Sequence, residues 1–223
     1  MQIISAPDLT LIKEAAVDFR HLLSRGYSRR AALALVGDRY QLDHTARQIL
    51  HRGVFAPDAA AARRAKLRLL RDLAGQPLGV DGHNVLITLE CAIRKLPLVA
   101  GDDGFIRDVG QVSRAFRPSP ETDRVLGLLA DYLADHPVGL IMVYYDAPLS
   151  RSGELAHRTG EIFAVRGLKA QAVAPPVPEH ELAAFPGPIA TSDTALIDAH
   201  GAVVDLAGEI IRERHWPVIP LGG

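Results

Sequence analysis

Four apolar runs in this sequence end in aspartate, and these carboxylates are the residues best placed to do chemistry. The runs are "PLGVD" (ending at Asp81), "PLVAGDD" (Asp102 and Asp103), "VGLIMVYYD" (Asp146) and "GPIATSD" (Asp193). If each run is a strand of one parallel sheet, the carboxylates converge on its carboxyl edge, where open α/β sheets bind ligands. Like charges gathered there repel, and a hard cation such as Mg²⁺ or Mn²⁺ relieves the repulsion. Such an ion can orient a water for attack on a phosphodiester.

Each aspartate also has a simpler interpretation, as a turn former or as the N-cap of the next helix. "DGHN" and "DDG" are typical of turns, and "SDTAL" is typical of a helix start. The recurrence of aspartate at every expected strand end favours a shared acidic site over capping alone.

The segment 146–156, "DAPLSRSGELA", adds candidate phosphate-binding groups. Ser150, Arg151 and Ser152 stand where a helix is expected to begin, and a helix N-terminus favours an anion. Ser152 could equally be the N-cap of that helix. In "GFIRD", Arg107 is a candidate phosphate clamp, with a surface ion pair to the next residue as the alternative. A serine nucleophile is not favoured, because "SRSGE" is not a G-x-S-x-G elbow.

Several classes of function find no support in the sequence. It contains no Walker loop and no G-x-G-x-x-G motif. Its single cysteine, Cys91, can form neither an internal disulfide nor a zinc finger, and it suits a reducing compartment. The longest apolar run, 138–145, is far shorter than the roughly 20 residues that span a bilayer. The N-terminus has no basic n-region of a secretory signal, so we expect a cytoplasmic protein.

Residues 1–75 are expected to form a small helical bundle of helix-turn-helix type. Apolar residues at three-to-four spacing predict a helix within 6–26. Ser28 is the predicted N-cap of a second helix, a third is expected over 44–53, and the alanine- and arginine-rich segment 56–75 favours a fourth.

After a boundary at 74–79, short β-like runs alternate with helical ones. This alternation predicts an α/β domain over 76–223, with a mostly parallel sheet covered by helices on both faces. The Pro-rich segment 174–188 is expected to be a surface connection.

The two parts differ in charge. Residues 1–75 carry 13 Lys and Arg against 7 Asp and Glu, and the rest of the chain carries 12 against 19. A basic module of this kind could follow the phosphate backbone of a nucleic acid, with a solvated polar face as the alternative. The basic residues concerned are Arg29, Arg30, Arg39, Arg47, Arg52, Arg63, Arg64, Lys66 and Arg68. No aromatic platform interleaves them, so base-specific recognition is not indicated.

Two motifs resemble those of a nuclease fold. "VDGHNVL" resembles the first motif of PIN and NYN-type nuclease domains, and "IATSDTAL" resembles their late motif. Over most of its length the chain is also similar to a prokaryotic family, domain of unknown function 434 with a PIN-like C-terminal partner. That similarity is carried by "LLSRGYSRRAALALVGDRYQLDHTARQILHRGVF", "DGHNVLITLE", "GDDGFIRDV", "DAPLSRSGELA" and "ATSDTALID".

The resemblance implies a role for individual residues. It places Asp81 as the first metal ligand, Asp193 as the late one and Asp146 as a middle acid. PIN domains usually carry their second acid on a helix, so Glu90 competes with Asp103 or Asp102 for that role. Asn84, in the "DGHN" turn, matches a polar residue that steadies the site or touches phosphate.

Together these features predict a metal-dependent nuclease, with Mg²⁺ or Mn²⁺ as cofactor and RNA as the favoured substrate. Asp81, Asp146 and Asp193 are the predicted catalytic ligands. Two alternatives remain at this level: a non-catalytic nucleic-acid- or partner-binding protein with a PIN-like fold, and a hydrolase of small phosphate esters. A homo-oligomer is compatible with the sequence.

Overall fold

The computed structural model describes residues 6–110, 119–147 and 151–222. The chain divides into two compact units. The first unit combines Met1–Ala65 with Leu96–Gly110 and Pro217–Gly223, and the second combines Lys66–Lys95 with Gln111–Trp216.

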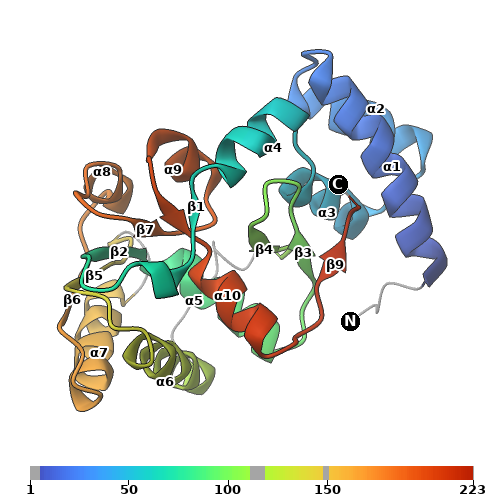
Figure 1. Cartoon of the computed structure of the whole chain (residues 1–223). Coiled ribbons are helices and arrows are strands. Elements are labelled where there is room, and N and C mark those ends of the chain that lie inside the picture. Colours follow the sequence, from blue (N-terminus) through green and yellow to red (C-terminus); the bar gives the residue numbers. More distant parts are fainter. Residues whose placement is uncertain (1–5, 111–118, 148–150, 223) are drawn as a thin grey trace. The chain divides into compact units, whose positions relative to one another are not determined.

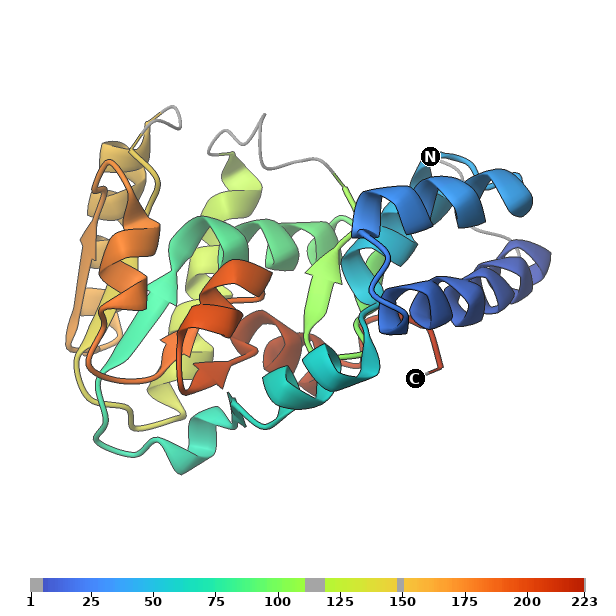
Figure 2. The ribbon, with the colours of Figure 1, turned by 90° about the horizontal axis from the view of Figure 1, so that it is seen from above.

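Helices dominate the first unit: α1 (Ala6–Ser24), α2 (Arg29–Arg39), α3 (His44–Gly53) and α4 (Pro57–Arg64). Their starts follow local sequence, because Ser28 accepts a hydrogen bond from the backbone of Ala31 and Asp43 accepts one from Ala46. Helices α1, α2 and α3 contact one another (Figures 1 and 2). In the described part of the chain, no helix is both long and apolar enough to cross a membrane.

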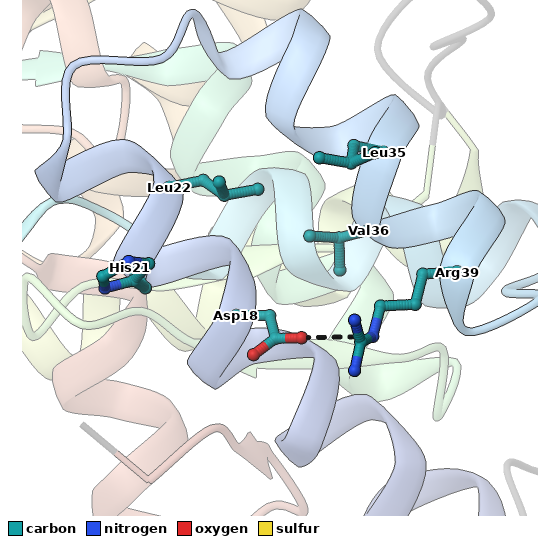
Figure 3. A pocket seen from close by; sticks show the side chains of 6 residues that line it. All are labelled: Asp18, His21, Leu22, Leu35, Val36 and Arg39. Carbon is teal, nitrogen blue, oxygen red and sulfur yellow. Dashed lines mark ion pairs between the residues drawn. The ribbon is translucent and has the colours of Figure 1, made fainter.

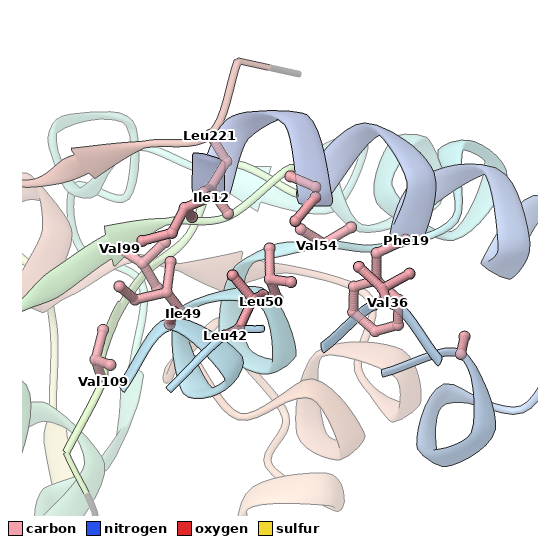
Figure 4. Close-up of a cluster of buried hydrophobic side chains, with 14 residues drawn as sticks. Ile12, Phe19, Val36, Leu42, Ile49, Leu50, Val54, Val99, Val109 and Leu221 are labelled. Carbon is pink, nitrogen blue, oxygen red and sulfur yellow. The ribbon is translucent and has the colours of Figure 1, made fainter. Parts of the chain in front are cut away.

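The core of the first unit brings together residues that lie far apart in the sequence (Figure 4). Phe19 of α1, Val36 of α2 and Leu50 of α3 are fully or almost fully buried in one cluster. Val99 and Leu221 join the same cluster. The segments 96–110 and 217–223 therefore belong with the N-terminal helices, although the sequence pattern placed both in the second domain.

A small sheet in the first unit has the strand order β4-β3-β9. Its strands are β3 (Leu98–Ala100), β4 (Ile106–Asp108) and β9 (Ile219–Pro220). Strand β3 pairs antiparallel with β4 and parallel with β9. The expectation that all four aspartate-ending strands share one sheet is thus wrong for Asp102 and Asp103, which follow β3.

The second unit is built on a six-stranded sheet in the order β1-β8-β7-β2-β5-β6, and every described pairing in it is parallel. The strands are β1 (Leu67–Arg68), β2 (Leu78–Asp81), β5 (Ile141–Tyr144), β6 (Ala170–Val173), β7 (Ile189–Ala190) and β8 (Val203–Val204). The helices are η1 (Leu70–Asp72), α5 (Gly82–Ile93), α6 (Pro120–Ala134), α7 (Ser152–Val165), α8 (Pro178–Ala183), α9 (Thr194–Ala199) and α10 (Leu206–Glu213).

Helices cover both faces of this sheet, which explains why its central strands are apolar on both sides. Helices α10, α5, α6 and α7 contact one another in succession and form one layer. Helices α8 and α9 contact each other, and they lie on the opposite face from α6 and α7 (Figure 1). The predicted mixed α/β fold, with a helical N-terminal part and a mostly parallel sheet, is confirmed.

The winding of the sheet reverses at β2. From β2 the chain moves through α5 and α6 to β5 and then to β6, on one side. From β7, which pairs with the other side of β2, it moves through α9 to β8. In open α/β sheets such a reversal leaves a crevice beyond the carboxyl ends of the two central strands. The residues that end β2 and follow β7 therefore lie beside this crevice.

Replacing Leu50 by Ala should destabilise the protein by about 2–5 kcal/mol, because the side chain is fully buried in the core of the first unit. Leu35→Ala is the matched control. Its side chain is 58% exposed, so we expect a change within about 0.5 kcal/mol. Urea unfolding measures both, and equal losses in the two variants would contradict the assignment of this core.

Candidate functional site

Asp81 ends β2 and caps the helix that follows. One carboxylate oxygen accepts a hydrogen bond from the backbone N–H of Asn84 at 3.4 Å, in the first turn of α5. The other oxygen accepts a hydrogen bond from the hydroxyl of Thr191 at 2.8 Å, just beyond β7. The side chain therefore bridges the two central strands at their carboxyl ends.

The surroundings of Asp81 favour its protonated form. Burial, and then the nearby carboxylates of Asp193 and Glu179, raise the pKa of this carboxyl to about 7. The hydrogen bonds from Thr191 and Asn84 act in the opposite direction, because they favour the charged form. A cation next to this group would reverse the balance and keep it ionised at neutral pH.

The turn after β7 is fastened to the start of α5. The side-chain oxygen of Asn84 accepts hydrogen bonds from the backbone N–H of Ser192 at 2.8 Å and from its hydroxyl at 3.0 Å. One oxygen of Asp193 caps α9 by accepting from the backbone N–H groups of Ala195 and Leu196. The structure thus brings Asp81, Asn84 and Asp193 together, and the remaining hydrogen-bonding capacity of Asn84 is its NH₂ group, a donor.

Asp146 lies at the same edge, two residues beyond β5, which neighbours β2. Its backbone N–H donates to Nδ1 of His83 at 3.0 Å, and its carbonyl accepts from the hydroxyl of Ser152 at 2.6 Å. Burial, and then the charge of Glu179, raises the pKa of its half-buried carboxyl. His83 and Ser152 thus hold the backbone N–H and carbonyl of Asp146, which lies at the carboxyl edge of the sheet.

His83, in the "DGHN" segment, is buried. Its ring packs edge-on against Tyr145 with centroids 5.1 Å apart. Burial lowers its pKa to about 4, so the ring is neutral. Since Nδ1 accepts the hydrogen bond from Asp146, the ring proton belongs on Nε2. His83 therefore positions the Asp146 segment.

Glu179 is a member of the site that sequence reasoning missed. It is an exposed residue in the first turn of α8, within the Pro-rich 174–188 segment. Its charge acts on both Asp81 and Asp146. It follows no strand, so the strand-end pattern could not reveal it. The only local signal was Pro178, which is typical of a first helical residue.

We call Asp81, Asp146, Glu179 and Asp193 the acidic edge. No three His, Cys, Asp or Glu side chains among the described residues are grouped closely enough to hold a metal ion by themselves. Mg²⁺ does not require such a cage, because it commonly takes one or two carboxylates and fills the remaining positions with water and substrate oxygens. Carboxylates that raise the pKa of Asp81 form an oxygen donor set of that kind. The acidic edge thus offers carboxylate oxygens, the type of donor that Mg²⁺ and Mn²⁺ prefer.

Glu90 does not reach the acidic edge. It lies eight residues beyond Gly82 on α5, on the order of 12 Å along the helix axis. It is buried, and its carboxylate accepts a hydrogen bond from the hydroxyl of Thr122. Its role in this structure is to link α5 to α6, and the expected approach to the other acids is not found.

Asp103 and Arg107 pair with each other in the first unit. The guanidinium of Arg107 donates two hydrogen bonds of 2.8 Å to the Asp103 carboxylate, and Asp103 is fully buried. Arg63 also contacts this carboxylate, at 3.4 Å. Asp102 is engaged in the same way by Arg20, through bonds of 2.9 and 2.8 Å. The predictions that Asp102 or Asp103 binds a metal and that Arg107 clamps a phosphate are therefore wrong. These residues form ion pairs within the first unit.

The predicted phosphate-binding segment is described only in part. Ser150 lies outside the described residues. Arg151 has a left-handed backbone, with φ of 67°, is exposed and pairs with Glu154 at 3.0 Å. Ser152 is the first residue of α7 and is buried, and its hydroxyl donates a hydrogen bond to the carbonyl of Asp146. Ser152 is thus neither the N-cap nor exposed to a ligand.

Comparison with known proteins shows the family. Residues 70–209 match the model described as Domain of unknown function (DUF5616), and residues 11–66 match Protein of unknown function (DUF434). The first match covers more than half of the chain. The chain belongs to the DUF5616 family. It is 30% identical over 203 residues to the uncharacterized protein MJ0935 of Methanocaldococcus jannaschii, covering 90% of this chain and 97% of that protein. No solved structure matches.

The two family matches divide the features described above. The DUF5616 segment contains β2, β5 and β7 with the whole acidic edge, whereas the DUF434 segment contains α2, α3 and α4 and most of α1. The acidic edge is therefore a feature of the DUF5616 part of the chain.

Asp81→Asn should change the pH dependence of stability. The carboxyl titrates near 3.8 in the unfolded chain and near 7 in the folded one, so the folded state loses stability as pH rises between these values. Asparagine cannot ionise and escapes this loss. In EDTA at pH 8, we expect the variant to be more stable than wild type by about 1–2 kcal/mol. Thermal unfolding at pH 4 should show no such gain; a difference independent of pH would contradict the shifted pKa.

Gly82→Ala should destabilise the protein by about 1–3 kcal/mol, because the added Cβ would lie 2.3 Å from Cε1 of Tyr145. That ring cannot retreat easily, since it is fully buried and its hydroxyl bonds Thr159 at 2.8 Å. The control is Gly160→Ala within α7, where an added Cβ meets no atom within 4 Å. There we expect a gain of up to about 1 kcal/mol. Chemical unfolding decides, and a neutral Gly82→Ala would contradict the close contact.

Proposed function

We propose that the acidic edge is the active site of a cation-dependent phosphodiesterase with a PIN-like fold, and that RNA is its substrate. The observation that carries the proposal is the position of Asp81: a partly buried carboxylate at the reversal point of the sheet, with the charges of Asp193 and Glu179 close enough to raise its pKa. Shifted pKa values of this kind, caused by burial and specific neighbours, are typical of functional sites.

Asp81, Asp146 and Asp193 are the residues that would hold the cation, one or two of them directly and the rest through its water ligands. Asp81 ends β2, and Asp146 and Asp193 follow β5 and β7. These three parallel strands are adjacent, so the three carboxylates lie at the same edge of the sheet. When bound, Mg²⁺ or Mn²⁺ supplies an activated water and neutralises charge on the scissile phosphate. Since the same acids repel one another without a cation, substrate-free protein should bind the ion as well.

The remaining residues of the site hold these groups and the substrate in place. The hydrogen bonds of Thr191 to Asp81 and of Ser192 to Asn84 fix the two sides of the reversal point. The NH₂ group of Asn84 is a suitable donor to a phosphate oxygen. The first turn of α5, which starts at Gly82, adds the positive end of a helix dipole at the same place.

The test is hydrolysis of a labelled single-stranded RNA by the full chain with Mn²⁺ or Mg²⁺ and with EDTA. Wild type should cleave only with metal, and Asp81→Asn should lower the rate at least about 100-fold. Asp135→Asn is the matched control, because this exposed aspartate follows α6 and precedes β5 at the amino edge of the sheet. Its rate should equal that of wild type.

Calorimetry with Mn²⁺ separates the steps. Wild type and Asp135→Asn should bind the ion, and the double variant Asp81→Asn with Asp193→Asn should not. If the protein binds metal and cleaves a small phosphate ester but not RNA, the proposed substrate becomes a small phosphate ester. Absence of both metal binding and cleavage in the wild type would overturn the proposal and leave a non-catalytic protein.

A further inference from the structure

A basic pocket lies between α2 and α3 in the first unit. It has a volume of about 480 Å³ and is lined by Arg29, Arg30, Leu33, Ala34, Arg47 and His51. No acidic residue is among the described side chains that line it. Three guanidinium groups and one imidazole therefore surround an aliphatic floor.

Arg29 is held rigidly at the back of this pocket. It donates to the carbonyl of His51 at 2.9 Å and to that of Val54 at 2.8 Å, which satisfies acceptors at the C-terminal end of α3. Its guanidinium also stacks over the rings of Phe55 and Phe19, 4.7 and 5.5 Å from their centroids. The charge is thus fixed in place.

Arg47 is positioned with similar precision. Its Nε donates to the carbonyl of Leu42 at 2.9 Å, and Nη2 donates to the exposed carboxylate of Asp38 at 2.8 Å. The guanidinium packs directly over Gly37, where an added Cβ would lie 2.1 Å from Nη1. Only glycine permits this approach. Neither of these hydrogen bonds uses Nη1.

The guanidinium of Arg29 is partly buried and has both basic and acidic groups near it. Burial, and then the charges of Arg63 and Arg107, lower its pKa to about 10, whereas Asp103 and Asp102 act in the opposite direction. Burial, and then the charges of Arg29 and Arg52, also lower the pKa of His51. The guanidinium groups that line the pocket match the oxygens of phosphate in geometry as well as in charge.

A second pocket in the same unit differs from the basic pocket in its charge (Figure 3). It lies between α1 and α2 and has a volume of about 400 Å³. Its one arginine, Arg39, is 3.5 Å from Asp18, which also accepts a hydrogen bond from Tyr40. The rest of its lining is mostly apolar, with Leu35 and Val36 among it. This pocket is balanced in charge and offers no comparable site for an anion.

Most other basic residues of residues 1–75 are already engaged within their own unit. Arg52 pairs with Asp108, Arg63 contacts Asp103, and the ammonium of Lys66 donates to two backbone carbonyls. These contacts therefore do not favour a broad surface on which all of these basic residues follow a phosphate backbone. Arg30, which is exposed, and the partly used Arg47 are the groups best placed to meet a ligand.

We propose that the pocket between α2 and α3 binds a phosphate group, with Arg30 and Arg47 as its direct ligands and Arg29 as a fixed charge behind them. The phosphate could be carried by a nucleic-acid strand or by a small phosphorylated compound, and Leu33 and Ala34 offer an apolar surface to the group that bears it. The proposal concerns binding alone. It can be measured in EDTA, so it stands or falls separately from hydrolysis at the acidic edge.

The test measures binding of a fluorescent single-stranded RNA by anisotropy and binding of pyrophosphate by calorimetry, using the full chain in EDTA. Arg30→Gln should weaken binding of whichever probe the wild type binds, by about tenfold at low salt. For RNA, it should also reduce the slope of log affinity against log salt by about one. Arg39→Gln is the matched control on the same helix, in the charge-balanced pocket, and should change affinity by less than about twofold.

Arg47→Gln gives an independent second variant, with thermal unfolding recorded because this residue also anchors Leu42 and Asp38. Loss of RNA binding in the Arg30 variant assigns the phosphate to a strand, whereas loss of pyrophosphate binding alone assigns it to a small compound. Wild type that binds neither probe, or equal losses in the Arg30 and Arg39 variants, would overturn the proposal.

Discussion

The direction in which the chain leaves β2 and β7 decides where the proposed active site lies. One crossover turns toward β5 and the other toward β8, so the two adjacent strands end beside each other with their following helices on opposite faces. Polar residues at both ends then face a common space. The hydrogen bonds from Thr191 to Asp81 and from Ser192 to Asn84 span that space and hold both turns in register.

The same arrangement leaves an electrostatic conflict in the native state. Within the described part of the chain, Asp81 accepts two hydrogen bonds that offset its burial, and Asp193 and Glu179 add negative charge nearby. A protein selected only for stability would gain by replacing this carboxylate with a neutral group. Retaining the Asp81 carboxylate costs stability unless a bound ion or a proton transfer uses it. The energetic cost of the acidic edge is therefore linked to the chemistry proposed for it.

The first unit shows how the same residue types can serve structure alone. Asp103 is fully buried, yet the two bonds from Arg107 satisfy its charge within the chain. Phe55 adds a ring against which Arg29, Arg63 and Arg107 all stack. An aspartate with a built-in guanidinium partner has no need of a cation, whereas the acids of the acidic edge lack such a partner among their described contacts.

Local sequence was sufficient for much of this structure. The helices of the first unit, their caps at Ser28 and Asp43, and the apolar runs that end at Asp81 and Asp146 follow from short-range preferences of side chain and backbone. Parallel strands separated by helices also follow from the order of the segments. These features depend on residues within one or two turns of one another.

Only the tertiary structure decided which strands share a sheet and which charges meet. Backbone hydrogen bonds can join any two strands, so "LVA" at 98–100 does not encode its pairing with Ile219–Pro220, more than a hundred residues away. Burial of Val99 and Leu221 among the N-terminal helices settles that choice and makes Asp103 part of the first unit instead of the six-stranded sheet. For the same reason, the approach of Glu179 to Asp81 has no local signature: it arises from packing between distant segments.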